Sequence, residues 1–130
     1  MKVTPYLHFN GNCADAIALY ERAFGIKARI FRYRDTPTSE GYTPPEGTED
    51  WVMHANIGDI IYLCDTPQKM TNGDAISVCV TLDSVAKVKD AYAALLEGGE
   101  SGMEPQQTFF AKCFSSLKDS FGVTWMVQCE

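Results

Sequence analysis

The chain has 130 residues, of which 17 are acidic and 11 are basic, and its net charge is −6. A chain of this length predicts one domain with a substantial core, because it buries roughly two thirds of the surface that its unfolded form exposes. The acidic excess, together with the lack of a Lys/Arg cluster, argues against nucleic acid or an anionic membrane as a partner.

The cysteines and the first residues point to a cytoplasmic protein. The chain has five cysteines, an odd number, and no two of them form a CxxC pair. This argues against a disulfide framework and against a zinc knuckle. Residues 1–6 lack the apolar core of a signal peptide, and no segment approaches 18 consecutive apolar residues. We therefore expect a soluble protein with free thiols in a reducing cytoplasm.

The first predicted elements are a strand over residues 3–9 and the helix that follows it. Apolar and polar side chains alternate along this strand, as expected when one face is buried and the other is wetter. Asn12 is the predicted N-cap of the helix, and Asp15 lies in its first turn. Gly25 is expected to end the helix, because glycine readily adopts the left-handed conformation found after many helices. The apolar stripe of the helix consists of Ala14, Ile17, Tyr20 and Phe24.

Three more strands and a long loop complete the first half of the chain. Residues 26–34 alternate apolar with basic side chains, which is typical of a strand with one solvated face. Residues 36–50 are rich in Pro and Gly and predict a loop, either a flap near a binding site or a plain surface excursion. Residues 51–57 and 60–64 predict two strands, joined by Gly58-Asp59 in a tight hairpin.

The second half has the same order of elements. A strand over residues 76–82 precedes a helix that Asp83 or Ser84 caps and that Gly98-Gly99 ends. Asp119-Ser-Phe-Gly122 has the Asp-first, Gly-fourth pattern of a type I turn. The remaining predicted strands cover residues 100–104, 108–117 and 123–129.

The element order predicts an α+β fold. Two β-α-β-β-β modules, about 1–65 and 75–130, would form one domain over residues 1–130. Packed side by side, they would give a curved, cavity-lined mixed sheet with helices on its convex side.

Several stretches resemble a known family. Residues 5–25 read PYLHFNGNCADAIALYERAFG and look like the opening of PhnB-like proteins, a branch of the vicinal oxygen chelate superfamily, which includes glyoxalase I, bleomycin-resistance proteins and extradiol dioxygenases. Residues 53–56, 59–65 and 118–127 agree with this resemblance in the expected order. The resemblance implies the vicinal oxygen chelate fold and a homodimer. Some PhnB-like sequences are called demethylubiquinone methyltransferases, but this chain lacks a glycine-rich loop that would hold a nucleoside cofactor.

Strand parity predicts which side chains face the cavity. On the last strand, Thr124, Met126 and Gln128 should face inward, while Trp125 and its apolar neighbours should pack on the helices. The same rule places both histidines of the chain on the cavity side. The predicted pocket-lining residues are Tyr6, His8, His54, Tyr62, Cys64, Cys79, Phe110 and Met126.

The resemblance also raises the question of a metal. Enzymes of this superfamily usually hold one divalent metal with four His or Glu side chains, and the matching positions here are Thr4, Tyr62, Ser77 and Met126. Because none is His or Glu, we expect no metal and no other cofactor. The alternative is an unorthodox Zn²⁺ site formed by His8, His54 and Cys64.

Other side chains have a structural and a functional interpretation. Phe110 and Phe114 are expected to pack in the core, with an aromatic wall of the pocket as the alternative. Cys64 and Cys79 are expected to be buried and unreactive, because no neighbouring His or Lys in the sequence would lower a thiol pKa.

The residues leave open whether the protein is an enzyme. The preferred hypothesis is a dimer that binds a small molecule without the usual metal. One alternative is a metal-dependent lyase, isomerase or dioxygenase acting on a small oxygenated substrate, which would use His8, His54 and another donor for the metal. His8 or His54 is also the candidate general base for a carbonyl or phosphoryl substrate. Another alternative is an interaction module with a vestigial concavity.

Overall fold

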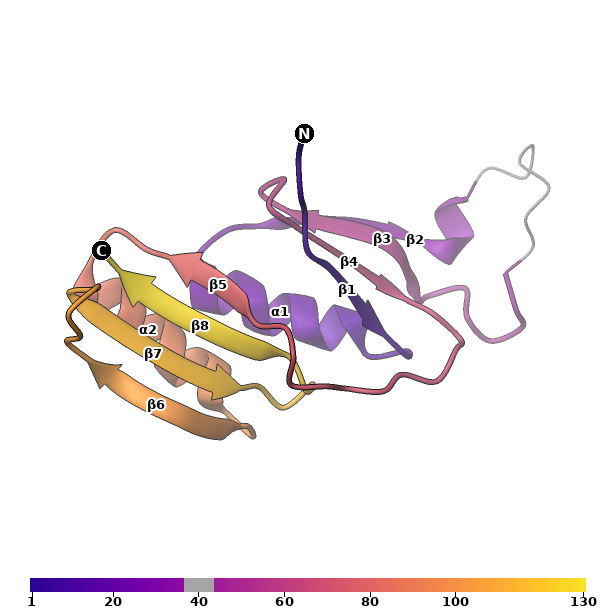
Figure 1. Cartoon of the computed structure of the whole chain (residues 1–130). Helices are drawn as coiled ribbons and strands as arrows, with labels where there is room; N and C mark the ends of the chain where they lie inside the picture. Colours follow the sequence, from indigo (N-terminus) through magenta and orange to yellow (C-terminus); the bar gives the residue numbers. More distant parts are fainter. Residues whose placement is uncertain (37–43) are drawn as a thin grey trace. The chain divides into compact units, whose positions relative to one another are not determined.

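The computed structural model describes residues 1–36 and 44–130. These residues form two compact units, the first with residues 1–21 and 25–71 and the second with residues 22–24 and 72–130. Figure 1 shows the element order along the chain, in which each β-α-β-β-β series builds its own four-stranded mixed sheet. The predicted α+β class and the two modules of this topology are therefore confirmed, and a single domain over residues 1–130 stays a prediction.

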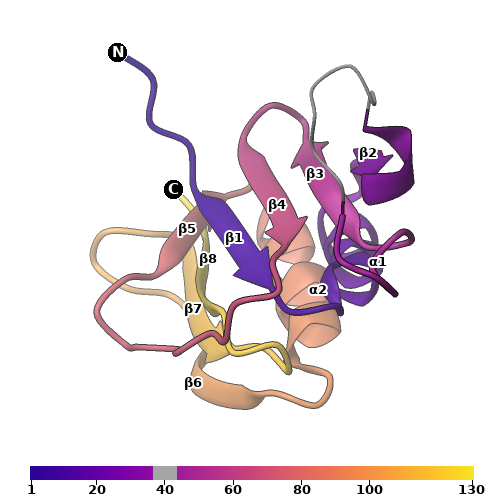
Figure 2. The ribbon, with the colours of Figure 1, turned by 90° about the vertical axis from the view of Figure 1, so that its right-hand side faces the viewer.

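The first unit is a four-stranded sheet accompanied by α1. Its strands lie in the order β1-β4-β3-β2, as can be followed in Figure 2. The parallel pair is β1 with β4, and the other two pairs are antiparallel. The elements are β1 (Tyr6–Phe9), α1 (Cys13–Phe24), β2 (Ala28–Arg32), a 3-10 turn η1 (Tyr33–Asp35), β3 (Val52–Ile57) and β4 (Ile61–Asp65).

The start of α1 differs from the prediction. Asn12 does precede the helix, but its side chain makes no capping hydrogen bond among the described residues. The carboxylate of Asp65, at the end of β4, instead accepts the N–H of Gly11 at 2.8 Å and that of Cys13 at 3.0 Å. Its other oxygen accepts the N–H of Val52 at 3.0 Å, so this buried side chain joins β4, the helix start and β3.

Two local predictions in the first unit are confirmed. Gly25 follows α1 in the left-handed conformation with a φ of 70°, and its N–H donates to the carbonyl of Glu21. Gly58 and Asp59 have φ values of 55° and 58°, which both central residues of a type I′ hairpin turn require. Of the loop predicted over residues 36–50, residues 37–43 lie outside the described residues, so its role as a flap stays a prediction.

The second unit repeats the arrangement with strands in the order β5-β8-β7-β6. Its parallel pair is β5 with β8. Ser84 caps the helix, since its hydroxyl oxygen accepts the N–H of Lys87 at 3.2 Å. The elements are β5 (Val78–Thr81), α2 (Val85–Leu96), β6 (Glu100–Gln106), β7 (Cys113–Lys118) and β8 (Thr124–Cys129).

The strand predicted from Thr108 begins too early. Thr108 N–H donates to the carbonyl of Ala111 in a turn, and β7 starts only at Cys113. The apolar run at Phe109 and Phe110 was the misleading signal, because both side chains are exposed and belong to the turn.

The type I turn predicted between the last two strands is confirmed. Gly122 N–H donates to the Asp119 carbonyl at 3.0 Å. The buried Asp119 carboxylate accepts the N–H groups of Phe121 and Val123 through Oδ1 and the indole N–H of Trp125 at 2.8 Å through Oδ2. One carboxylate thus holds both the hairpin and the largest core side chain of this unit.

The parity rule holds along β8. Trp125, Val127 and Cys129 are buried, whereas Thr124, Met126 and Gln128 are half-buried on the opposite face. Among the described residues, no helix is long and apolar enough to span a membrane.

Candidate ligand-binding site

Five of the predicted site residues come together on one face of the first sheet. We call this the histidine face, and it consists of Tyr6, His8, His54, Tyr62 and Cys64. The strand register explains the gathering, since Tyr6 pairs with Tyr62 and His8 pairs with Cys64 across β1 and β4. On the other side of β4, Tyr62 pairs with Asn56, which places His54, two residues earlier on β3, on the same face.

Tyr6 links the two histidines. Its hydroxyl lies 2.7 Å from Nδ1 of His54, and its ring stacks on the His8 ring with the centroids 5.1 Å apart and the planes at 14°. His54 also meets the edge of Tyr62 at 5.1 Å, and Tyr62 meets Tyr6 at 5.6 Å. Lys2 Nζ lies 5.8 Å from the centroid of the Tyr62 ring, within reach of a cation–π contact. Two imidazoles and two phenols therefore form one connected cluster.

Cys64 completes the histidine face from β4. Its sulfur lies 3.3 Å from Nδ1 of His8, and the residue is 9 % exposed. Burial, and then the neighbouring Asp65 carboxylate, raise the pKa of the Cys64 thiol. Burial also raises the pKa of the Tyr6 hydroxyl, with a further contribution from Cys64. Both groups thus keep their protons at neutral pH, which disfavours Cys64 as a thiolate nucleophile.

The other three predicted site residues lie in the second unit. Cys79 on β5 pairs with Met126 on β8, so these two share one sheet face. The expected burial of Cys79 is wrong, because this residue lies on the edge strand β5 and is exposed. Phe110 is not in the core either, since it is 53 % exposed and meets Phe114 edge-on at 5.2 Å.

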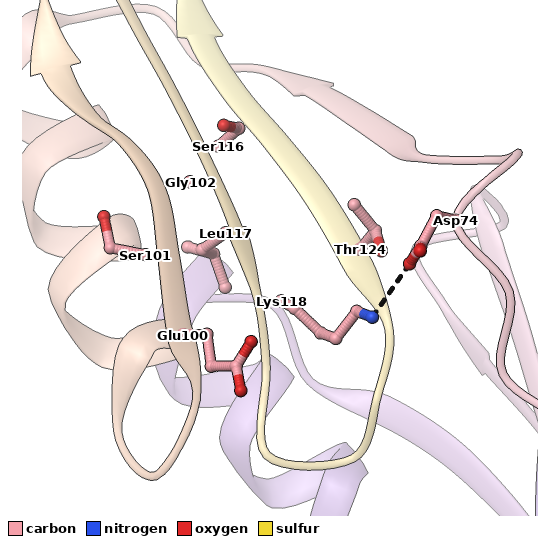
Figure 3. A pocket seen from close by; sticks show the side chains of 8 residues that line it. All are labelled: Asp74, Glu100, Ser101, Gly102, Ser116, Leu117, Lys118 and Thr124. Atoms are coloured by element: carbon pink, nitrogen blue, oxygen red, sulfur yellow. Dashed lines mark hydrogen bonds and ion pairs between the residues drawn. The ribbon is translucent and has the colours of Figure 1, made fainter.

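The second unit also contains a small cavity that the sequence did not predict. It measures about 200 Å³, less than the roughly 300–1,000 Å³ of typical small-molecule sites. Figure 3 shows Lys118 reaching toward Asp74, and the ammonium and carboxylate are 2.9 Å apart. Thr124 Oγ1 is buried and has no hydrogen-bond partner in the described part of the chain. The lining residues are Asp74, Glu100, Ser101, Gly102, Ser116, Leu117, Lys118 and Thr124.

The donor chemistry does not fit the metal centre that the superfamily resemblance implies. Tyr62 and Met126 occupy two of the matching positions, and a thioether is a poor ligand for the hard or borderline cations of such sites. Within residues 1–36 and 44–130, no three His, Cys, Asp or Glu side chains are grouped so that they could hold a metal ion. The Nδ1 atoms of His8 and His54 are moreover engaged by Cys64 and Tyr6.

Comparison with known proteins establishes the family. The family model described as 3-demethylubiquinone-9 3-methyltransferase matches residues 1–128. Protein YjdN of Escherichia coli K12 is 30 % identical over 138 residues, which cover 98 % of this chain and 94 % of YjdN. The chain belongs to this PhnB-like family.

Solved structures agree with this assignment. Protein PA1353 from Pseudomonas aeruginosa is 32 % identical, with a TM-score of 0.84 and coverage of 100 % of this chain and 98 % of PA1353. The PhnB protein from Bacillus cereus is 23 % identical with a TM-score of 0.76, and both chains are covered completely. A glyoxalase/bleomycin resistance protein/dioxygenase family enzyme from Burkholderia phytofirmans shares the fold at 14 % identity and a TM-score of 0.62, over 95 % of both chains. The predicted superfamily fold is confirmed.

Proposed function

We propose that this PhnB-like protein binds a small organic molecule at the histidine face of the first unit. The observation that supports this most is the position of Tyr6, which stacks on His8 and is hydrogen-bonded to His54. Small-molecule sites typically combine aromatic walls with a few well-placed polar groups, and the histidine face has both.

The exposure of these side chains supports binding over a purely structural role. Tyr6 is 42 % exposed, His8 is exposed, and His54 and Tyr62 are half-buried. These four side chains therefore leave part of their aromatic surface and polar atoms accessible to a ligand. A flat ligand could lie against the rings of Tyr6 and Tyr62 while it hydrogen-bonds to an imidazole.

The remaining site residues belong to the proposal as a second group. Cys79, Met126 and Phe110 supply sulfur and aromatic surface in the second unit, and we propose them as ligand contacts of that unit. A homodimer in the cytoplasm is also proposed, from the family resemblance and from the free cysteines. Light scattering during size-exclusion chromatography tests the dimer, and a 14.4 kDa monomer at working concentration would contradict it.

A thermal-shift screen against a metabolite library tests the binding function. A ligand present at a hundred times its dissociation constant should stabilise the fold by about 2.7 kcal/mol. We expect His54→Ala and His8→Ala to lose the shift. The exposed Asp83→Ala variant in the second unit serves as a control and should keep it. Hits that survive both histidine substitutions would exclude the histidine face as the binding site.

A further inference from the structure

We infer that Tyr6 and Cys64 hold both imidazoles with the proton on Nε2, so that the histidine face presents two N–H donors to an oxygen acceptor such as a carboxylate. The inference rests on the proposed function and specifies the ligand class of the same site. It selects a ligand with a carboxylate or carbonyl oxygen over a ligand of the same shape that carries an ammonium group.

The Tyr6 contact determines the tautomer of His54. The phenol has one proton to donate, and imidazole nitrogen is a stronger acceptor than a phenolic oxygen or a thiol sulfur. The Tyr6 hydroxyl, 2.7 Å from Nδ1 of His54, therefore donates the hydrogen bond and Nδ1 accepts it. Burial raises the pKa of Tyr6, which keeps the donated proton on the phenol. A neutral imidazole whose Nδ1 accepts must carry its own proton on Nε2.

The Cys64 contact does the same for His8. The sulfur lies 3.3 Å from Nδ1 of His8, within range for a hydrogen bond that involves sulfur. Burial and the Asp65 carboxylate raise the pKa of the thiol, so it is an S–H group that faces the imidazole. Because sulfur is a weak acceptor and imidazole nitrogen a good one, the thiol donates and the proton of His8 lies on Nε2.

Both Nε2 atoms are then available to a ligand. In the described part of the chain, the hydrogen bonds of His8 and His54 run through Nδ1 alone. The carboxylate next to Cys64 in the sequence, that of Asp65, already accepts the three backbone N–H groups of Gly11, Cys13 and Val52. Lys2, whose ammonium lies near Tyr62, adds positive charge on this side. Two N–H donors beside a cation favour an anionic or carbonyl oxygen.

Long-range ¹H–¹⁵N NMR of the histidine side chains tests the tautomers in the ligand-free protein. We expect both His8 and His54 to show a protonated Nε2 and an unprotonated Nδ1 at a pH where they are neutral. A protonated Nδ1 in either neutral imidazole would overturn the inference. Tyr6→Phe, which keeps the ring and removes the donor, should shift Nδ1 of His54, whereas Tyr92→Phe in the second unit should not.

A matched pair of ligands tests the selectivity. Benzoate should perturb the two imidazole signals at a concentration about tenfold lower than benzylammonium, since a hydrogen bond to a charged acceptor is worth roughly one such factor or more. Tyr6→Phe should reduce the preference for benzoate over benzylammonium, and Tyr92→Phe should leave it unchanged. Equal binding of both ligands would overturn the inference while supporting the proposed function. The predicted tautomers without binding of either ligand would overturn the acceptor selectivity but leave the Tyr6 and Cys64 network intact.

Discussion

The two units share one plan and differ in the chemistry of the sheet faces that carry the predicted site residues. Each has the element order β-α-β-β-β along the chain. The strands also lie in equivalent order within each sheet, β1-β4-β3-β2 in the first unit and β5-β8-β7-β6 in the second. The first unit gathers two imidazoles and two phenols on its face, whereas the second has a thiol, a thioether and a lysine–carboxylate pair. The shared frame therefore fixes the positions of the strands, and the individual residues decide which chemical groups each sheet face carries.

The units also use a buried aspartate in different ways. Asp65 accepts N–H groups from the helix start and from β3, so it connects segments that are 13 to 54 residues away in the chain. Asp119 accepts two N–H groups of its own turn and the indole of Trp125, all within six residues. One carboxylate organises the unit over long range, and the other organises a hairpin.

Replacement of these aspartates should produce the largest effects. Asp65→Ala and Asp119→Ala each leave three donors without their acceptor, and each should lower the free energy of unfolding by about 3 kcal/mol or more. Urea denaturation measures the loss. Asp83→Ala is the matched control, because its ion pair with Lys87 is exposed and should be worth less than about 1 kcal/mol. A loss from Asp65→Ala no larger than that of the control would show that its three hydrogen bonds do not organise the first unit.

Alkaline pH should weaken the first unit through its buried thiols. The folded protein raises the pKa of Cys13 and of Cys64, in both cases mainly through burial. The contribution of these two protonated thiols to the free energy of unfolding is therefore complete below the pKa of an unfolded thiol, about 8.5. It is lost as the pH rises above that value. The free energy of unfolding should fall between pH 7 and pH 10. When each protein is compared with itself at pH 7, Cys13→Ala should lose less than the unsubstituted protein. An unchanged slope in that variant would contradict the assignment to Cys13.

The rate of thiol labelling should differ between Cys79 in the second unit and Cys64 on the histidine face. Cys79 is exposed, whereas the other four cysteines are buried. We expect a disulfide reagent to label one thiol per native chain first, and Cys79→Ser to remove that phase. The labelling should be slow near neutral pH, because the partial burial of this thiol, and then the charge of Glu130, raise the pKa of Cys79. Labelling of Cys64 at the same rate would contradict the covered position assigned to it on the histidine face.

The smallest effect should come from the exposed ion pair in the second unit. The hydrogen bond from Lys118, and then its charge, lower the pKa of the Asp74 carboxyl. The ionised Asp74 carboxylate contributes to the free energy of unfolding above the pKa of an unfolded aspartate. This contribution disappears as the pH falls through the lowered pKa of Asp74 in the folded state. Carboxyl NMR should show the titration of Asp74 move up in Lys118→Met, and high salt should reduce the difference. A titration that does not change in Lys118→Met would contradict the pairing.

Local patterns were sufficient to predict most of the fold. The alternation along β8, the Gly58-Asp59 hairpin and the stop at Gly25 depend on neighbours in the chain, and all three are confirmed. The turn at Asp119 was predictable for the same reason. Phe109 and Phe110 show the limit of such patterns, because an apolar run in an exposed turn has the composition of a strand.

Long-range contacts could not be predicted in the same way. Asn12 has the residue type of a helix cap, but the acceptor comes from Asp65, 52 residues after Cys13. The signal that could have pointed to Asp65 is a carboxylate at the end of an apolar strand. For the histidine face, parity predicted a common side for Tyr6, His8 and His54. The hydrogen bond between Tyr6 and His54 and the stacking of Tyr6 on His8 depend on the strand register as well.

The most direct test of the account follows the two histidines together by NMR during a ligand titration. If the histidine face is one site, a bound carboxylate should shift the His8 and His54 signals with one common dissociation constant, and Tyr6→Ala should abolish the common response. Shifts that follow two different constants, or a common response that persists in Tyr6→Ala, would contradict the claim that Tyr6 unites them.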